Sequence, residues 1–134
     1  MSQVNIRKAF EKKLITFTPA NTISFENASF TPVNNVPYYE CRLAPQDVLN
    51  PTLGDNYHRE VGVFQIVLCF PAGNGGQAAA AKAEELKQFF RRSTTLVESG
   101  TTVIVDKTPS IGRGYIESNR YCVPIRISYF TNEF

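Results

Sequence analysis

Residues 59–92 constrain the fold more than any other stretch, because a strand, a glycine-rich loop and a helix follow one another there. Segment 60–70 is rich in β-branched and aromatic residues, which is typical of a well-buried strand. Pro71 ends the strand, since proline has no N–H to donate to a continuing ladder. The helix that follows must lay its apolar stripe on a sheet, and the preceding strand is the obvious member of that sheet. The stripe consists of Ala79, Ala83, Leu86 and Phe90.

The predicted helix begins at Gln77, where the composition changes to strong helix formers that continue to Arg92. Residues 72–76 form a turn with nearly free backbone dihedral angles, because three of the five are glycine. Asn74 and Gln77 have the spacing of a helix-capping pair. We therefore expect a capped helix directly after the glycine-rich turn.

Apolar periodicity predicts the other elements as well. The complete set is a helix at 2–14, strands at 22–26, 38–44, 60–70, 101–106 and 121–130, and the helix at 77–92. Residues 46–58 form a long loop, 93–100 a connection, and 108–119 a hairpin or loop. The last strand directs Tyr121, Val123, Ile125, Ile127 and Tyr129 inward, and Pro124 indicates an edge position or a bulge.

The predicted order α-β-β-β-α-β-β indicates an α+β fold, because neighbouring strands flank a single crossover helix. We expect a single, mostly antiparallel (mixed) β-sheet with two helices packed on one face. The chain has 134 residues, 43% of them hydrophobic, which suits one domain over residues 1–134 with one core.

The bulk composition excludes several classes of function. A net charge of +2, spread through the chain, is too weak to predict a nucleic-acid-binding face. The three cysteines are widely spaced and form no CxxC pair, so we expect reduced core thiols rather than a zinc site. The N-terminal residues lack the apolar core of a signal peptide, and every apolar run is too short to span a bilayer. A soluble protein that is not exported by a signal is expected.

Two patterns could carry chemistry, and both have a simpler explanation. Residues 73–78 fit G-x-G-x-x-A, the dinucleotide fingerprint, but the second strand and acidic residue that should follow are missing. A strand-to-helix turn explains the glycines. His58, with Asp55 and Glu60 nearby, could be a supported base, although a single histidine in a charged loop is more often just exposed. We therefore predict no catalytic, cofactor-binding or metal-binding residue.

Tyrosine and arginine at turns and strand ends indicate surfaces that bind protein, because these residues anchor protein interfaces. The loop 46–58 and the segment 112–115 look long enough to reach a neighbouring subunit. The predicted interface residues are Asp55, Tyr57, His58, Arg59, Arg91, Arg92, Arg113, Tyr115, Arg120 and Phe134.

The order and spacing of several motifs resemble the phage tail-terminator family, in particular a small domain of siphophage and prophage tails. The motifs are Ile-Ser-Phe-Glu-Asn at 23–27, Phe-Thr-Pro at 30–32, Arg-Leu-Ala-Pro at 42–45, Gly-Val-Phe-Gln-Ile-Val-Leu at 62–68, Pro-Ala-Gly-Asn-Gly at 71–75, Thr-Val-Ile-Val at 102–105 and Val-Pro-Ile-Arg-Ile-Ser-Tyr at 123–129. The similarity covers nearly the whole chain, although each motif alone is mostly a fold signature.

The resemblance implies a structural virion protein without enzyme activity or cofactor. Such proteins form a six-membered ring on the head-proximal end of the tail tube, stop its polymerisation and offer the surface that docks to the head connector. The implied partners are other copies of the chain, the tail tube protein and the neck proteins. No membrane and no sequence-specific nucleic acid is implied, although DNA can pass through the ring. The implied location is the virion, and the host cytoplasm during assembly.

Two alternatives are open at this point. The chain could be another neck or tail-completion component, such as a head-closure protein, since these proteins are similarly small and also form rings. It could instead be a small nucleotide-binding enzyme that uses the loop 73–78.

Overall fold

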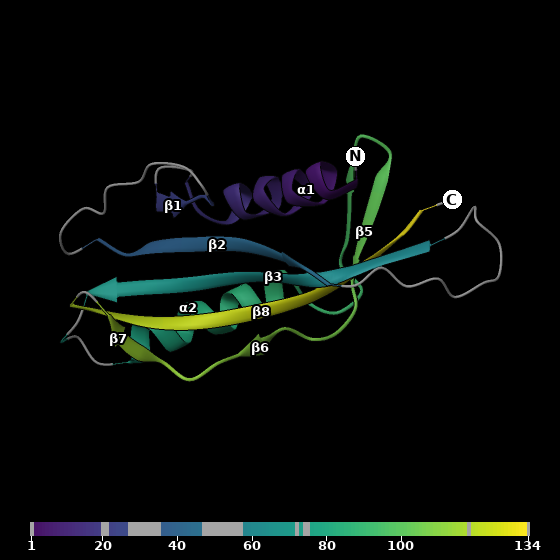
Figure 1. Cartoon of the computed structure of the whole chain (residues 1–134). Coiled ribbons are helices and arrows are strands. Elements are labelled where there is room, and N and C mark those ends of the chain that lie inside the picture. The colour runs from purple at the N-terminus through teal and green to yellow at the C-terminus, as the bar shows by residue number, and fades with distance from the viewer. Residues whose placement is uncertain are drawn as a thin grey trace.

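The protein has an α+β fold, in which two helices pack on a mixed, curled β-sheet (Figure 1). The computed structural model describes residues 2–19, 22–26, 36–46, 58–71, 73, 76–117 and 119–133. In chain order, the elements within these residues are α1 (Ser2–Phe17), β1 (Ile23–Ser24), β2 (Tyr38–Pro45), β3 (His58–Pro71), α2 (Gln77–Phe89), β4 (Thr95–Glu98), β5 (Thr101–Val105), β6 (Ser110–Ile111), β7 (Tyr115–Glu117) and β8 (Arg120–Glu133).

Two long strands, β3 and β8, form the centre of the sheet. They pair antiparallel over their whole lengths, from His58 opposite Glu133 to Pro71 opposite Arg120. The strand order is β1-β2-β3-β8-β5-β4, and β6 and β7 also pair with β8. The N-terminal half of β8 therefore borders β6 and β7, whereas its C-terminal part borders β5. Among the described strands, β1 and β2 are the only parallel pair.

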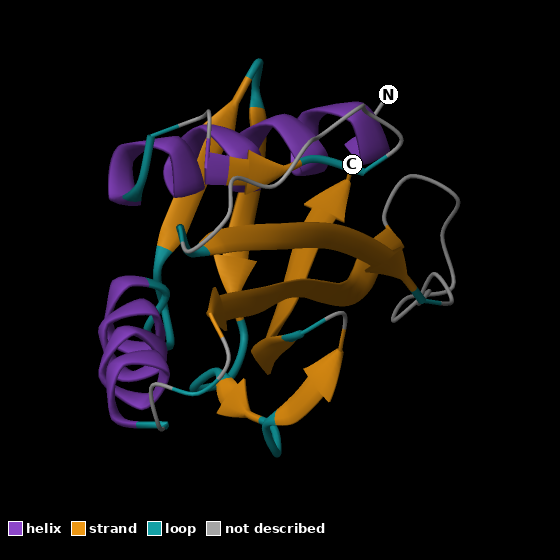
Figure 2. Cartoon of the chain, turned by 90° about the vertical axis from the view of Figure 1, so that its left-hand side faces the viewer, coloured by secondary structure: helices purple, strands orange, loops and turns teal. Residues whose placement is uncertain are grey.

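Both helices cover the same face of the sheet, as the sequence predicts (Figure 2). The α2 stripe is confirmed, because its four members are all buried. Helix α1 buries Ile6, Ala9, Phe10 and Leu14 in the same core. The Phe10 ring stacks on the Phe64 ring, with 4.6 Å between centroids and 10° between planes. Helix α1 is thereby fixed to the middle of β3.

The connection predicted at residues 93–100 contains a strand instead, β4, which pairs antiparallel with β5. The two strands are joined by Ser99 and Gly100, both with positive φ (50° and 83°), as the tight turns of β-hairpins require. A four-residue strand with one buried apolar side chain, Leu96, is too short to show a period. The predicted loop 108–119 likewise holds the short strands β6 and β7, which β8 organises by pairing.

Smaller corrections concern the ends of elements. Helix α1 continues to Phe17, three residues past its predicted end, whereas the strand predicted at 22–26 is reduced to Ile23–Ser24. Helix α2 ends at Phe89, and its N-cap residue is Gly76, without a side-chain capping bond. The N-cap position predicted for Asn74 is therefore wrong, because Gly76 occupies it; Asn74 itself lies outside the described residues.

Pro124 lies inside the sheet, between β3 and the segment that carries β6 and β7. The predicted edge position is wrong, because β8 has neighbouring strands on both sides. Pro124 itself, however, pairs only with Val67 of β3 among the described residues. The Pro124 carbonyl accepts a hydrogen bond from the Gly112 N–H at 2.8 Å, so this side of Pro124 faces the break between β6 and β7. The missing proline N–H thus costs no ladder bond with β3.

Gly62 lies opposite Tyr129, and no other residue fits there without a shift. A Cβ at position 62 would lie 2.5 Å from the Tyr129 hydroxyl and 2.8 Å from the Ala44 carbonyl oxygen. The Tyr129 hydroxyl is buried and has no hydrogen-bond partner among the described residues. The glycine therefore makes room for a large buried ring.

Replacing Gly62 with alanine should lower the free energy of unfolding by about 1–3 kcal/mol, because the core is overpacked. Urea unfolding measures the loss. Replacing Tyr129 with phenylalanine in the same variant should recover part of it, since the hydroxyl is the nearest atom. Equal stability of the G62A and wild-type proteins, or no coupling between the two changes, would contradict this account.

Candidate interaction surfaces

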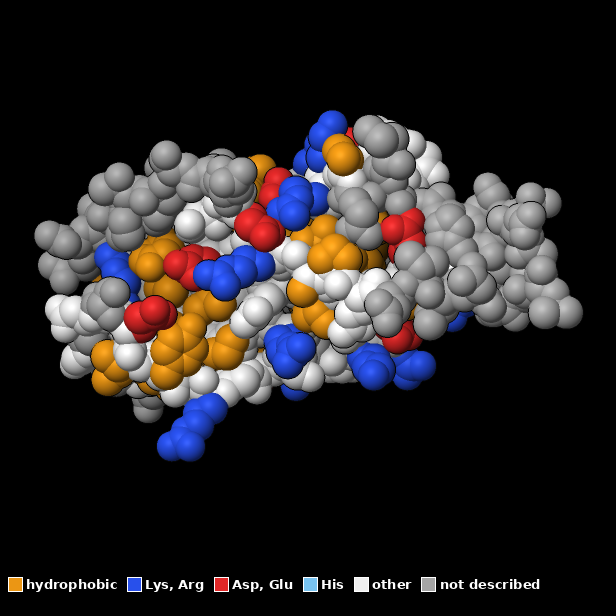
Figure 3. Space-filling view, in the orientation of Figure 1, with side chains coloured by type: hydrophobic (Ala, Val, Ile, Leu, Met, Phe, Trp, Pro, Cys, Tyr) orange, Lys and Arg blue, Asp and Glu red, His pale blue; other side chains and the backbone are white. Residues whose placement is uncertain are grey.

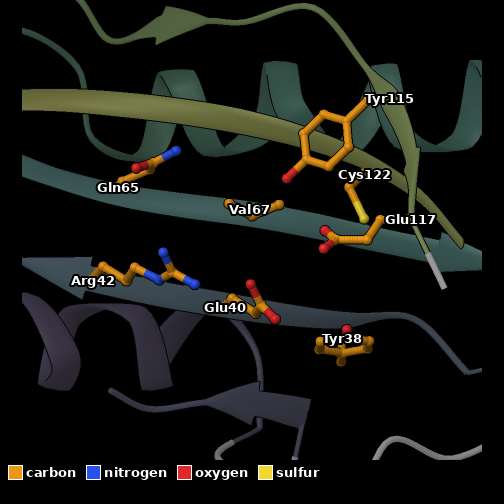
Figure 4. Close-up of a pocket in the computed structure, with 8 residues that line it drawn as sticks. All are labelled: Tyr38, Glu40, Arg42, Gln65, Val67, Tyr115, Glu117 and Cys122. Atoms are coloured by element: carbon orange, nitrogen blue, oxygen red, sulfur yellow. The ribbon is translucent and has the colours of Figure 1, made fainter. Parts of the chain in front are cut away.

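The face of the sheet opposite the helices is polar and open (Figure 3), with charged side chains between patches of hydrophobic ones. Alternation along β2 produces it, because Tyr39, Cys41 and Leu43 are buried while Glu40 and Arg42 lie on the other side. Side chains of β2, β3, β7 and β8 surround a hollow of about 330 Å³ on this face (Figure 4). Its lining residues are Tyr38, Glu40, Arg42, Gln65, Val67, Tyr115, Glu117 and Cys122.

The hollow offers hydrogen bonds and charges rather than an activated nucleophile. Burial raises the pKa of Tyr38 and of Tyr115, so both phenols stay protonated at neutral pH. Burial also raises the pKa of Cys122, which keeps it as a thiol rather than the reactive thiolate. Among the described residues, no cluster of three or more His, Cys, Asp or Glu side chains could hold a metal ion. The arrangement suits binding of another polar surface.

Arg120, one of the predicted interface residues, lies at the start of β8 and is only 9% exposed. Its Nη1 donates a hydrogen bond of 2.7 Å to the Val36 carbonyl, and its guanidinium lies 4.9 Å from the centre of the Tyr38 ring. These contacts fix the entry to β2 against β8 within one subunit. A contact of Arg120 with a neighbour stays a prediction.

Arg59 lies at the other end of the sheet, near the start of β3. Its Nε donates to the Asn132 Oδ1 at 3.0 Å, and its guanidinium lies 4.7 Å from the centre of the Phe130 ring. Because β3 and β8 are antiparallel, Arg59 and Arg120 are separated by the length of the ribbon. The structure therefore does not bring these two predicted residues together.

The other predicted residues are spread over the surface. Arg91 and Arg92 are exposed in the turn after α2, and Arg113 is exposed between β6 and β7. Tyr115 begins β7 and is 42% exposed at the rim of the hollow. His58 begins β3, although its side chain is not described. The predicted residues Asp55, Tyr57 and Phe134 lie outside the described residues, as does nearly all of the loop 46–58.

The sequence analysis does not single out the two most exposed large apolar side chains of the described residues. Ile116 on β7 is 73% exposed and Val97 on β4 is 67% exposed. Their strands lie at opposite ends of β8, since Ile116 pairs with Tyr121, whereas β4 reaches β8 through β5 and Phe130 (Figure 1). Single exposed apolar side chains are common on protein surfaces, so neither residue marks a contact site by itself. The one sequence feature that could have indicated β4, and with it Val97, is the Ser99-Gly100 dipeptide of the turn that follows this strand.

The surroundings of the glycine-rich loop do not support a dinucleotide site. Gly73 has a φ of 89°, a conformation that suits glycine. A dinucleotide fold needs a parallel strand beside the one that precedes the loop. Strand β3 instead has antiparallel neighbours on both sides within the described sheet, β2 and β8.

No helix in the described part of the chain is both long and apolar enough to cross a membrane. Comparison with known proteins indicates the protein's class. The family model described as phage tail terminator protein matches residues 5–129. No curated protein matches the chain.

Two solved structures are similar over almost the whole chain. One, whose name states no function, shares 30% sequence identity with a TM-score of 0.80, covering 98% of this chain and 96% of that one. The other is a chain from the virion of a native gene transfer agent particle, with 16% identity, a TM-score of 0.64, and 98% and 97% coverage. At that identity the second likeness shows the shared fold alone. On the family match over residues 5–129, the chain belongs to the phage tail terminator family, a family of structural rather than enzymatic proteins of the phage tail.

Proposed function

We propose that this protein forms a six-membered ring on the head-proximal end of the phage tail tube, ends tube polymerisation there and offers the surface that joins the head. The observation that carries the proposal is the family match over residues 5–129. Its partners are then other copies of itself, the tail tube protein and the head–tail connector proteins. It acts in the virion after assembly in the host cytoplasm, and DNA passes through the ring.

The distribution of exposed apolar side chains supports a head-to-tail ring. Such a ring needs two different, complementary patches on each subunit. Val97 and Ile116 each supply one exposed apolar side chain, and the two lie at opposite ends of β8. From Tyr121 to Phe130 a strand extends about 30 Å, so the two side chains cannot meet within one subunit. We propose that β4 of one subunit contacts β7 of the next.

Disabling the gene in the parent phage should give abnormally long tails of variable length, unattached to heads. Without a cap, the tube keeps adding subunits because nothing occupies its growing end. Negative-stain microscopy of lysates measures the lengths, and a plasmid copy of the gene provides the control by restoring them.

Each other outcome of this experiment has a defined meaning. Tails of normal length that fail to join heads would contradict termination and indicate a neck component. Normal, infectious particles would contradict both virion roles. The alternative would then be nucleotide binding by the glycine-rich loop, and a thermal-shift screen with nucleotides would test it.

A further inference from the structure

Cys69 and Cys122 lie directly opposite each other on the two central strands. Their sulfur atoms are 3.2 Å apart, and both side chains are 2% exposed. With Val67 and Tyr38 they form a small apolar cluster on the face away from the helices. The third cysteine, Cys41, belongs to the main core on the opposite face. Of the three cysteines, two are therefore in contact with each other, and the third lies apart from them.

The backbone at this pair suits a cross-strand disulfide. The Pro124 carbonyl accepts from Gly112, so it points away from β3, and the pair Val67–Pro124 is of the non-hydrogen-bonded kind. Two residues further along, Cys69 and Cys122 are of the same kind, because the pattern alternates. Such pairs have Cα atoms about 4.5 Å apart, at the short end of the range of about 4.4–6.8 Å that disulfides bridge. The bond therefore needs little backbone movement.

The polar hollow gives a small oxidant a route to this pair. Cys122 lines the hollow of about 330 Å³ (Figure 4), whereas Cys69 is not among the lining residues. Hydrogen peroxide is little larger than water and fits such a space. Cys122 is thus the residue that an oxidant meets first, and Cys69 is placed to react second.

We propose that Cys69 and Cys122 form an oxidation site, at which a peroxide converts the two thiols into a disulfide that links β3 to β8. The Cys122 thiolate attacks the O–O bond, which gives a sulfenic acid and releases hydroxide. Cys69 then attacks the sulfenic sulfur, the S–S bond forms, and the hydroxyl group leaves as water. In total, two thiols and one hydrogen peroxide give one disulfide and two waters.

We expect the reaction of these thiols with peroxide to be slow. Burial raises the pKa of Cys122 and also of Cys69, so little thiolate is present at neutral pH. In a reducing cytoplasm the pair stays as thiols, and oxidising surroundings such as those of a free virion favour the disulfide. Only this last consequence rests on the proposed function, because the bond itself depends on the fold alone.

The test is to treat the full-length folded protein with hydrogen peroxide, remove the peroxide with catalase, unfold the protein and alkylate the remaining thiols. We expect two of the three cysteines to lose alkylation, a Cys69–Cys122 cross-linked peptide, and recovery of all three thiols with dithiothreitol. The variant Cys41→Ala is the matched control and should form the same cross-link. The variant Cys122→Ala should form no intramolecular cross-link.

Two results would overturn the proposal, and neither depends on a variant that might not fold. One is full alkylation of all three cysteines in the treated wild-type protein. The other is a set of disulfides that is the same whether peroxide acts on the folded or the urea-unfolded protein, since selectivity must come from the fold. Tail length is measured separately, so failure here and failure of the terminator role are distinguishable.

Discussion

Replacing Phe10 with alanine should lower the free energy of unfolding by about 3–5 kcal/mol, a large part of the total of about 5–15 kcal/mol for a domain. Phe10 is 0% exposed and joins three elements of the core. Its ring lies 4.6 Å from that of Phe64 on β3, 6.1 Å from Phe90 after α2, and 5.4 Å from Tyr129 on β8. The alanine would leave a cavity at the point where both helices meet the sheet.

Urea unfolding followed by circular dichroism measures this loss. The matched control is Ile15→Ala on the same helix, where the side chain is 42% exposed and the change should stay within about 0.5 kcal/mol. If the alanine variant does not fold, Phe10→Leu can be measured instead; we expect it to lower the free energy of unfolding by less. Similar losses in the Phe10 and Ile15 variants would show that α1 is not anchored by its buried stripe.

The core of the fold could be predicted because its residues repeat with a clear period. The α2 stripe and the inward side chains of β2 and β8 follow directly from periods of 3.6 and 2. Strands β4, β6 and β7 have two to four residues each, too few for a period. They exist because β5 and β8 supply backbone partners, which is tertiary information. The position of Pro124 inside the sheet was missed for the same reason.

The interaction surface was predictable only in part. Residue type predicts that arginines occur at interfaces. It does not tell which arginines instead make contacts within the subunit, such as the hydrogen bond that Arg120 donates to the Val36 carbonyl. Exposure of Val97 and Ile116 depends on which face of a short strand meets the core. The pairing of Cys69 with Cys122 depends on the register of β3 against β8, and one residue of slip would separate them.

The head-to-tail contact proposed between β4 of one subunit and β7 of the next can be tested by introducing a complementary charge pair. Val97→Asp alone and Ile116→Lys alone should each prevent tail termination, because each places an unpaired charge in an apolar contact. The loss of one such contact is of the order of 2 kcal/mol, or roughly 30-fold in affinity, and every contact of a ring is affected at once. Tail length in lysates, with only the variant supplied, measures the effect.

The double variant V97D/I116K should restore short tails, at least in part, because the aspartate of one subunit then meets the lysine of the next. Rescue cannot arise within a subunit, since the two positions lie at opposite ends of β8. Ala80→Asp, on the exposed side of α2, is the control and should terminate tails normally. Unchanged melting temperatures in all variants would exclude misfolding as the cause. Single variants that terminate tails normally, or a double variant as defective as the singles, would show that β4 and β7 do not contact each other across the ring.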